Sequence, residues 1–276
     1  MSFLAQEQGV DTSSPIELYE FVYDGERWYY TSGDTSYQDP ITLRLYEPLI
    51  ITRGNIVFSS EANRNTLDLG VVRDTPFLNL FRVTAPSGVV LVTIKRVHRT
   101  DIVDEISVLW SGRILNVEWD TITAKLMCES IRTSSKRYGL RRNFQLQCPH
   151  VLYGSGCGVS KASYEVTTNV TSIIGTTLTL SGIGSYATDY FAGGMLQWTN
   201  SSVVAEERRL ITSNSGGGLT VVSPPVGLTV GDSVKLYPGC DHGISSNGCE
   251  KFSNTDNFGG FPHTPMKNPF GSEPLF

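Results

Sequence analysis

Short runs in which apolar and polar residues alternate recur along the first half of the chain and predict β-strands joined by tight turns. The clearest pair, residues 16–23 and 27–31, flanks Asp24-Gly25, a dipeptide that readily adopts the positive φ angles of a two-residue hairpin turn. The other strands predicted in this half are residues 41–46, 56–59, 89–97, 106–110, 114–119 and 122–128. The pattern is typical of a series of hairpins.

Two irregular features are expected within this half. Ile114, Val117 and Trp119 do not alternate perfectly, which predicts a β-bulge in the strand that holds them. Asp74 is placed to start a short helix, because Pro76 is favoured in a first helical turn and apolar residues follow it.

The second half has another β-patterned block, from about residue 164 to residue 236. Its predicted strands are residues 166–174, 176–180, 195–199, 208–212, 219–222 and 233–237, with the flexible sequence 213–218 between two of them. Residues 253–276 are rich in Phe, Pro, Gly and Asn and have almost no strand or helix pattern. Such an arm is expected to lie along another surface, through its residues Phe258, Phe261, Pro262 and Phe270.

Composition narrows the class of protein. The chain has 276 residues, 39% of them hydrophobic, which is enough to bury a core and excludes disorder over most of its length. Its net charge of −5 argues against a protein that coats nucleic acid. No apolar run approaches the roughly 20 residues of a membrane-spanning helix, and the first twenty residues predict no signal peptide. Abundant Thr, Val, Gly and Tyr favour strands over helices.

Four of the five cysteines lie in two matching units with the pattern Cys-x-His-x5-Gly-Cys. The first unit holds Cys148, His150, Gly156 and Cys157, and the second holds Cys240, His242, Gly248 and Cys249. The units bracket residues 158–239, so a compact domain with adjacent ends would bring them together. The fifth cysteine, Cys128, follows a strand pattern and is expected to be a buried small hydrophobe.

Three chemistries remain open for the paired units. Two local disulfides would close short loops, but an odd number of cysteines and the absence of an export signal speak against a complete disulfide framework. Zinc prefers ligands two to four residues apart, closer than these. An iron–sulfur cluster needs four thiolates around a larger body, which suits wide loops with glycine beside the ligand. His150 and His242 are either ligands or hydrogen-bonding residues of the turns.

The chain carries no recognisable enzyme signature. It has no nucleophile elbow, paired-histidine zinc motif, phosphate-binding loop or dinucleotide fingerprint, and we expect no catalytic residues. A basic stretch just before Cys148 contains Arg137, Arg141 and Arg142 and no acid. These arginines are expected to balance a negative charge nearby, or else to line a path for DNA.

Residues 148–164 and 238–265 closely resemble a family of long-tailed bacteriophage tail-tip hub proteins, which includes the hub proteins of gene transfer agents and is similar to the minor tail protein L of lambda-like phages. The shared motifs are Cys-x-x-x-Leu-Tyr-Gly and Cys-Gly-Val, then Gly-Cys, a further Cys and a closing Asn-Phe-x-Gly-Phe-Pro-His at residues 257–263. This sequence departs from the family at Asp241-His242, where a basic residue is common.

The resemblance implies a non-enzymatic virion component at the tail tip of a siphovirus-like particle, assembled in the host cytoplasm. It implies a [4Fe–4S] cluster held by Cys148, Cys157, Cys240 and Cys249, with zinc as the alternative at the same cysteines. It also implies a homotrimer that contacts the ring of distal tail protein, the fibre-bearing central hub protein and the tape-measure protein, without a membrane span. A role in gating DNA ejection, with transient contact to the exiting DNA, is a further expectation.

The expected architecture is all-β. A hub β-barrel domain is predicted over residues 1–147 and an inserted small barrel or sandwich over residues 158–239. The two cysteine loops, residues 148–157 and 240–249, would join them at the cluster, and an extended arm would complete the segment 240–276. A rival hypothesis is a glycan-binding or cell-wall hydrolase module, in which Trp28, Trp198 and Tyr190 are candidate sugar platforms.

Overall fold

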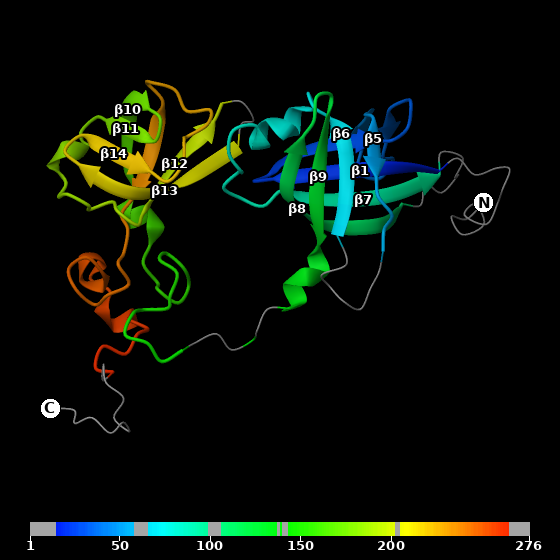
Figure 1. Ribbon diagram of the computed structural model, residues 1–276. Coiled ribbons are helices and arrows are strands. Elements are labelled where there is room, and N and C mark those ends of the chain that lie inside the picture. The colour runs from blue at the N-terminus through cyan, green and yellow to red at the C-terminus, as the bar shows by residue number, and fades with distance from the viewer. Residues whose placement is uncertain are drawn as a thin grey trace. The chain divides into compact units, whose positions relative to one another are not determined.

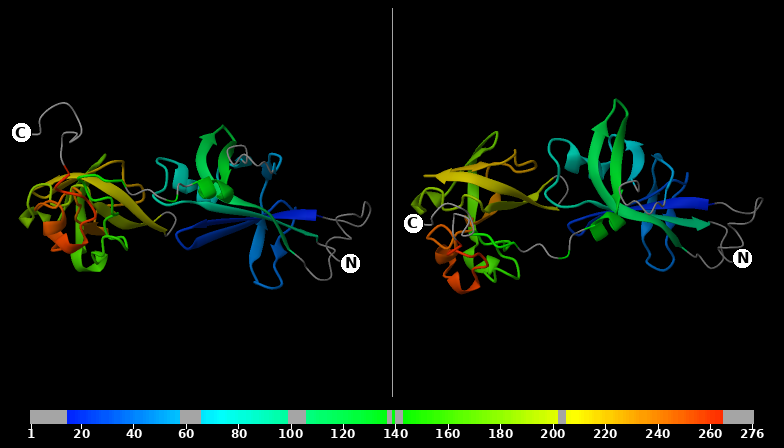
Figure 2. Two further views of the ribbon diagram at one scale, coloured as in Figure 1. Left: turned by 90° about the horizontal axis from the view of Figure 1, so that it is seen from below. Right: turned by 60° about the horizontal axis from the view of Figure 1, so that its bottom comes forward.

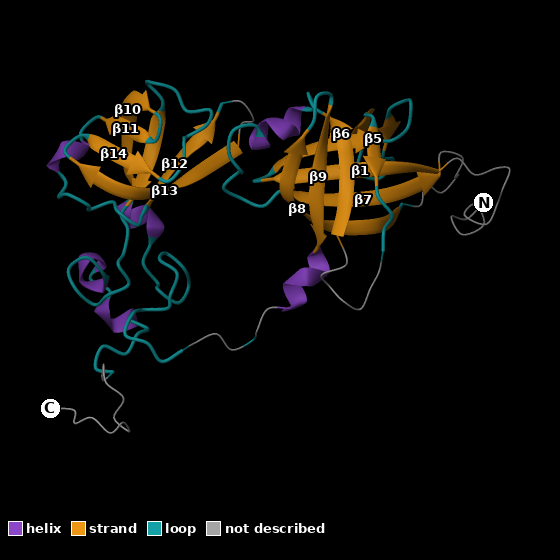
Figure 3. Ribbon diagram, viewed as in Figure 1, coloured by secondary structure: helices purple, strands orange, loops and turns teal. Residues whose placement is uncertain are grey.

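We analysed a computed structural model, which describes residues 15–57, 66–98, 106–136, 139, 143–201 and 205–264 (Figure 1). The fold is all-β, as predicted: over this part of the chain the helices are short 3₁₀ segments and the rest is strand and loop (Figure 3). The chain divides into two compact units. The first comprises residues 1–137 with Asn200–Glu207, and the second comprises residues 138–199 and 208–276.

The first unit is a nine-stranded sheet with the order β3-β4-β2-β1-β7-β8-β9-β6-β5. Its strands are β1 (Pro15–Tyr23), β2 (Glu26–Thr31), β3 (Tyr37–Gln38), β4 (Leu45–Pro48), β5 (Ile51–Arg53), β6 (Thr66–Val72), β7 (Leu91–His98), β8 (Ser107–Trp119) and β9 (Thr123–Ser130). A closed barrel is predicted here, but among the described residues the strands form one sheet whose pairing ends at β3 on one side and at β5 on the other. Both edge strands are very short, which limits the unpaired backbone that they expose.

The local turn chemistry acts as the sequence predicts. Asp24 and Gly25 have φ angles of 47° and 93°, and they join β1 to β2 in the expected hairpin. The two strands predicted at 106–110 and 114–119 are one strand, β8, whose register against β9 shifts between Ile114 and Asn116. The predicted bulge is therefore confirmed.

Two strand predictions are wrong, whereas the short helix predicted near Asp74 is confirmed with a slightly later start. Residues 41–44 form a turn rather than a strand, because the buried carboxylate of Asp39 accepts hydrogen bonds from the backbone there. No strand covers residues 56 and 57 (residues 58 and 59 lie outside the described part). The strands β5 and β6 form where none was predicted, although buried and exposed residues alternate clearly along β6. The helix expected from Asp74 is the 3₁₀ helix η2 (Pro76–Phe81), whose Phe77 stacks on Phe21 with ring centroids 4.2 Å apart.

The core of the first unit lies between the sheet and η2. Fully buried Phe21, Phe77, Leu69 and Leu126 are central to it. Residues Asn200–Glu207 complete this unit: Ala205 joins the core, and the Glu207 carboxylate accepts a 2.7 Å hydrogen bond from the hydroxyl of Tyr23.

The second unit contains a closed six-stranded barrel with the order β10-β11-β14-β13-β12-β15, which confirms the barrel predicted for the insert. Its strands are β10 (Val166–Ile174), β11 (Thr177–Leu180), β12 (Met195–Asn200), β13 (Ala205–Ser215), β14 (Gly218–Val221) and β15 (Ser233–Tyr237). Alternate aliphatic residues such as Leu178, Ile211 and Leu236 fill its interior. One cysteine unit lies just before the first strand of this barrel, and the other lies just after its last strand.

Candidate metal centre

The two cysteine loops, residues 148–157 and 240–249, lie side by side next to the barrel (Figures 1 and 2). The first loop precedes β10 and the second follows β15, and β10 and β15 are paired strands of the barrel. Cys148 and Cys249 are buried, whereas Cys157 and Cys240 are half-buried. All five cysteines of the chain are free thiols. The barrel therefore brings together two loops that are far apart in the sequence and that each carry two thiols.

A reciprocal contact joins the two loops at Cys148 and His242. The Cys148 amide donates to the carbonyl oxygen of His242 at 2.8 Å, and the His242 ring Nδ1 lies 3.0 Å from the carbonyl oxygen of Cys148. His242 adopts the left-handed backbone conformation, with φ 61°. Its ring is therefore a hydrogen-bonding group of the turn, which is one of the two roles considered for it.

Three of the four sulfurs accept hydrogen bonds from N–H groups. The amide of His242 donates to Cys240 Sγ at 3.3 Å, and the amide of Gly259 donates to Cys148 Sγ at 3.3 Å. The Asn254 side-chain amide lies 3.7 Å from Cys157 Sγ and donates to the Cys157 carbonyl oxygen at 2.6 Å. Such donors stabilise thiolate sulfur and are common around metal-bound cysteines.

The four thiols also interact electrostatically. Burial raises the pKa of Cys249 to about 11, and the negative charges of Cys240, Cys148 and Cys157 raise it further in the same direction. Burial likewise raises the pKa of Cys240, with smaller contributions from Cys157 and Cys148. Four thiolates held this way repel one another, so a positively charged centre among them would relieve the repulsion.

Three glycines in and near the cysteine loops have no room for a side chain. A Cβ on Gly156 would lie 2.6 Å from the His150 ring Nδ1, and one on Gly259 would lie 2.4 Å from its Nε2. A Cβ on Gly248 would lie 1.9 Å from the carbonyl oxygen of Gly243. The His150 imidazole thus packs between the first loop and the segment at Gly259, a role different from that of His242 at the matching position.

The start of the C-terminal arm packs on the chain itself. The 3₁₀ helices η6 (Cys249–Phe252) and η7 (Thr255–Asn257) follow the second loop. The Phe261 amide then donates to the Gln145 carbonyl at 2.9 Å, and the Phe261 ring contacts that of Phe144 with centroids 4.8 Å apart. The arm was expected to dock elsewhere through Phe258, Phe261, Pro262 and Phe270. Phe261 contacts Phe144 of its own chain and is still 37% exposed, and Phe270 lies outside the described residues, so docking of the arm on another surface stays a prediction.

One cation near the cysteines was missed from the sequence. The Lys251 ammonium donates to the carbonyl oxygens of Tyr190 at 2.6 Å and Gly239 at 2.9 Å, and lies 4.5 Å from the centre of the Tyr190 ring. Burial lowers the pKa of Lys251. Its position two residues after Cys249 is the sequence feature from which a cation near the cysteines could have been predicted. The predicted charge-balancing residues Arg137, Arg141 and Arg142 lie outside the described part of the chain.

The donor chemistry fits a thiolate-bound metal centre: the thiols are free, and N–H groups donate to three of the four sulfurs. Among the described residues, however, no three His, Cys, Asp or Glu side chains are grouped closely enough to hold a metal ion. An iron–sulfur cluster is a larger body than one ion, and its ligands surround it at greater separation. Cys148, Cys157, Cys240 and Cys249 are the residues that would hold such a group.

The remaining candidates lie away from these loops. Cys128 is buried in β9 within the core of the first unit, as predicted, and burial raises its pKa to about 12. Trp198 is buried inside the barrel unit, and the Tyr190 ring is covered by Lys251, so neither is an open sugar platform. Trp28 is partly buried against the core of the first unit. None of the helices in the described part of the chain has the length and apolar character needed to cross a membrane.

Comparison with known proteins links the fold to phage-like particles. A chain from the solved structure titled "Virion of native gene transfer agent (GTA) particle" matches with a TM-score of 0.77 and 17% sequence identity, over 100% of this chain and 99% of that chain. Residues 189–268 match a family model described as phage conserved hypothetical protein BR0599. This segment includes Cys240 and Cys249 of the second loop. No curated protein matches the chain.

Proposed function

We propose that this protein is a structural component of the tail tip of a phage-like particle, where its four paired cysteines hold a [4Fe–4S] cluster. Two comparisons support the first part of the proposal. The chain shares its whole fold with a protein of a gene transfer agent virion, and its segment 189–268 matches a phage family model. The proposed neighbours are those of a tail-tip hub: further copies in a trimer, the distal tail protein ring, the fibre-bearing central protein and the tape-measure protein.

The observation that supports the second part is that two loops joined by the Cys148–His242 contact each carry two free thiols. Cys148 and Cys157 precede the barrel, and Cys240 and Cys249 follow it. N–H groups of His242, Gly259 and Asn254 point to three of the sulfurs. A cluster bound there would supply four iron–thiolate bonds that cross-link the two loops.

In this proposal the chain's own residues do the positioning. The Cys148–His242 contact sets the two loops against each other, and His150 fills the gap between Gly156 and Gly259. Lys251 ties the segment after the second loop to the carbonyl oxygens of Tyr190 and Gly239 and adds a positive charge near Cys240. We propose a role that is architectural rather than catalytic. Measuring turnover of host cell-wall material by purified protein tests this, and turnover lost on replacing one Asp or Glu would contradict it.

Metal analysis tests the cysteine assignment directly. Protein purified without oxygen should contain iron and acid-labile sulfide in equal amounts, with broad visible absorption. Cys148→Ser should lose most of both. The matched control is Cys128→Ser, because Cys128 is a buried free thiol remote in sequence from the two loops. Zinc without sulfide would instead support the zinc alternative. If the protein contained neither iron nor zinc, the proposed metal centre would be overturned.

Labelling of assembled particles tests the virion assignment separately. An antibody against this protein, bound to purified particles and viewed by electron microscopy, should mark one end of the tail. Absence of the protein from purified particles would overturn the assignment, whatever the metal analysis gives.

A further inference from the structure

Tyr153 lies in the middle of the first cysteine loop, in a turn that would suit a smaller residue. The Gly154 amide donates to the Val151 carbonyl oxygen at 3.0 Å, so residues 151–154 form a tight turn with Tyr153 at its third position. Tyr153 has a φ angle of 62° there. Glycine or asparagine adopts a positive φ angle at this position with less strain than an aromatic residue. The loop therefore keeps a strained tyrosine that its own turn does not require.

The Tyr153 side chain contacts the chain on both sides of the second loop. Its hydroxyl donates to the Pro238 carbonyl oxygen at 2.8 Å, just before that loop begins. Its ring makes edge contacts with the rings of Tyr237 and Phe252, whose centroids lie 6.2 Å and 6.1 Å away. Tyr237 ends strand β15, and Phe252 ends η6, which begins at Cys249. One side chain of the first loop thus joins the segments that precede and follow the second loop.

The residues that receive Tyr153 are held in place by other parts of the second unit. Tyr237 is buried and paired with Met195 of the barrel, and its hydroxyl donates to Glu165 at 2.7 Å. Phe252 is also buried, and its carbonyl oxygen accepts a 3.1 Å hydrogen bond from the hydroxyl of Tyr164. Tyr153 therefore binds a surface that the barrel and its flanking segments form without any contribution from a metal.

Tyr153 also lies within electrostatic range of one cysteine from each loop. Burial raises the pKa of Tyr153, and negative charges on neighbouring groups, Cys157 and Cys240 among them, raise it further. Interactions between charges weaken with their separation, so both thiols are near the tyrosine. Loss of the Tyr153 side chain should therefore disturb the second loop as well as its own.

We infer that Tyr153 is a positioning residue, which holds the first cysteine loop against the second before any group binds to the four thiols. The inference rests on the proposed function and adds the order of assembly to it. The loops fold first, and they receive the cluster in a site that is already formed. Small zinc domains follow the opposite order, because the metal drives their folding.

Hydrogen exchange of the full-length, metal-free protein tests the inference. Peptides covering residues 237–252 should be protected in the wild type. Tyr153→Gly and Tyr153→Asn both remove the ring and suit a positive φ angle, and each should accelerate this exchange at least tenfold. Tyr153→Phe keeps both ring contacts and should restore most of the protection. The matched control is Val151→Gly, which loosens the same turn at a side chain that is 77% exposed.

Three outcomes of the exchange measurement would overturn the inference. The first is a second loop that is unprotected in the metal-free wild type and becomes protected only when iron and sulfide are added. The second is equal exchange in the wild type and the two variants that lack the ring. The third is an acceleration in Val151→Gly as large as that in Tyr153→Gly.

Uptake of iron and sulfide gives a second measurement that separates this inference from the proposed function. Broad visible absorption should develop at least tenfold more slowly in Tyr153→Gly than in the wild type, and Tyr153→Phe should restore the rate. Equal rates in the wild type and Tyr153→Gly would overturn the positioning role. If the wild type develops no such absorption, the proposed cluster is wrong, and the exchange measurement still decides whether Tyr153 holds the two loops together.

Discussion

Cys148 and His242 contact each other twice, once through the carbonyl oxygen of each residue. The Cys148 amide donates to His242, and the His242 ring lies 3.0 Å from the Cys148 carbonyl oxygen. Both residues belong to the matching Cys-x-His units, yet the contact runs between the units rather than within one. The two cysteine loops are therefore joined by protein hydrogen bonds at the residue that we propose as the first cluster ligand.

The first prediction concerns the His242 ring. His242→Ala removes the ring contact and places alanine at a positive φ angle, so the two loops should separate more often. We expect the local opening free energy of the first loop to fall by about 1–2 kcal/mol. Hydrogen exchange of peptides covering residues 145–157 measures this, with exposed His263→Ala as the control. His242→Asn should lower this opening free energy by less, because asparagine tolerates the left-handed conformation. Equal exchange in all four proteins would contradict the prediction.

The second prediction is an energetic coupling between Gly259 and His150. Gly259→Ala places a Cβ 2.4 Å from the His150 ring and should destabilise the packing by about 1–3 kcal/mol. His150→Ala vacates that space, so the double variant should be more stable than the sum of the two single effects predicts. The same exchange measurement gives all four corners of this cycle. Gly184→Ala is the control, because its Cβ would make only ordinary contacts. Strict additivity would show that the two residues do not share the space.

The third prediction separates two lysines of the second unit. Lys251→Met leaves the carbonyl oxygens of Tyr190 and Gly239 without their ammonium donor, and we expect a loss of about 1–3 kcal/mol in the opening free energy of the second loop. Lys235→Met removes only a surface ion pair with Glu165, whose cost should stay below about 1 kcal/mol. Hydrogen exchange of peptides covering residues 239–252 measures the effect of each variant on the opening of the second loop. A larger effect at Lys235 than at Lys251 would refute the assignment.

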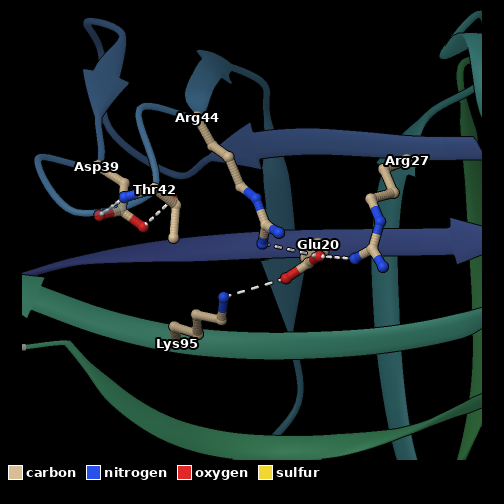
Figure 4. Close-up of polar contacts among 6 residues, drawn as sticks. All are labelled: Glu20, Arg27, Asp39, Thr42, Arg44 and Lys95. Atoms are coloured by element: carbon tan, nitrogen blue, oxygen red, sulfur yellow. Dashed lines mark hydrogen bonds and ion pairs between the residues drawn. The ribbon is translucent and has the colours of Figure 1, made fainter.

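The fourth prediction is a pH dependence that arises at Glu20. Burial by itself would raise the pKa of this carboxyl, but hydrogen bonds and charges from Lys95, Arg27 and Arg44 lower it below its ordinary value of 4.5 (Figure 4). A lowered folded-state pKa contributes stability that is complete above about pH 4.5 and is lost as the pH falls through the folded value.

Glu20→Gln should therefore lower the free energy of unfolding at pH 7 by about 1–3 kcal/mol. The gap from the wild type should narrow toward pH 3. Urea denaturation followed by tryptophan fluorescence measures it, since Trp28, Trp110 and Trp119 belong to the first unit. A gap that stays constant from pH 7 to pH 3 would exclude Glu20 as its source.

Features that depend on neighbouring residues could be predicted from the sequence. The Asp24-Gly25 turn and the bulge near Ile114 formed where the pattern placed them. Five of the six barrel strands did so to within one residue, whereas β13 (Ala205–Ser215) extends into the sequence 213–218 that was predicted to be flexible. Turn residues and a period of two act over a few residues, so one segment contains the whole signal. The strand prediction at residues 41–44 fails because it used this local pattern alone. The apolar pattern there resembles a strand, but the buried Asp39 carboxylate holds these residues in a turn.

The sequence by itself determined the all-β class, a small separate β-domain in the second half of the chain and the two matched cysteine units. Only the tertiary structure decided that the first sheet ends at β3 and β5 within the described residues, that His150 packs against glycines while His242 binds Cys148, and that Lys251 binds the carbonyl oxygens of Tyr190 and Gly239. These outcomes depend on contacts between residues up to about a hundred positions apart. Many weak interactions fix such contacts together, and no single stretch of sequence records them.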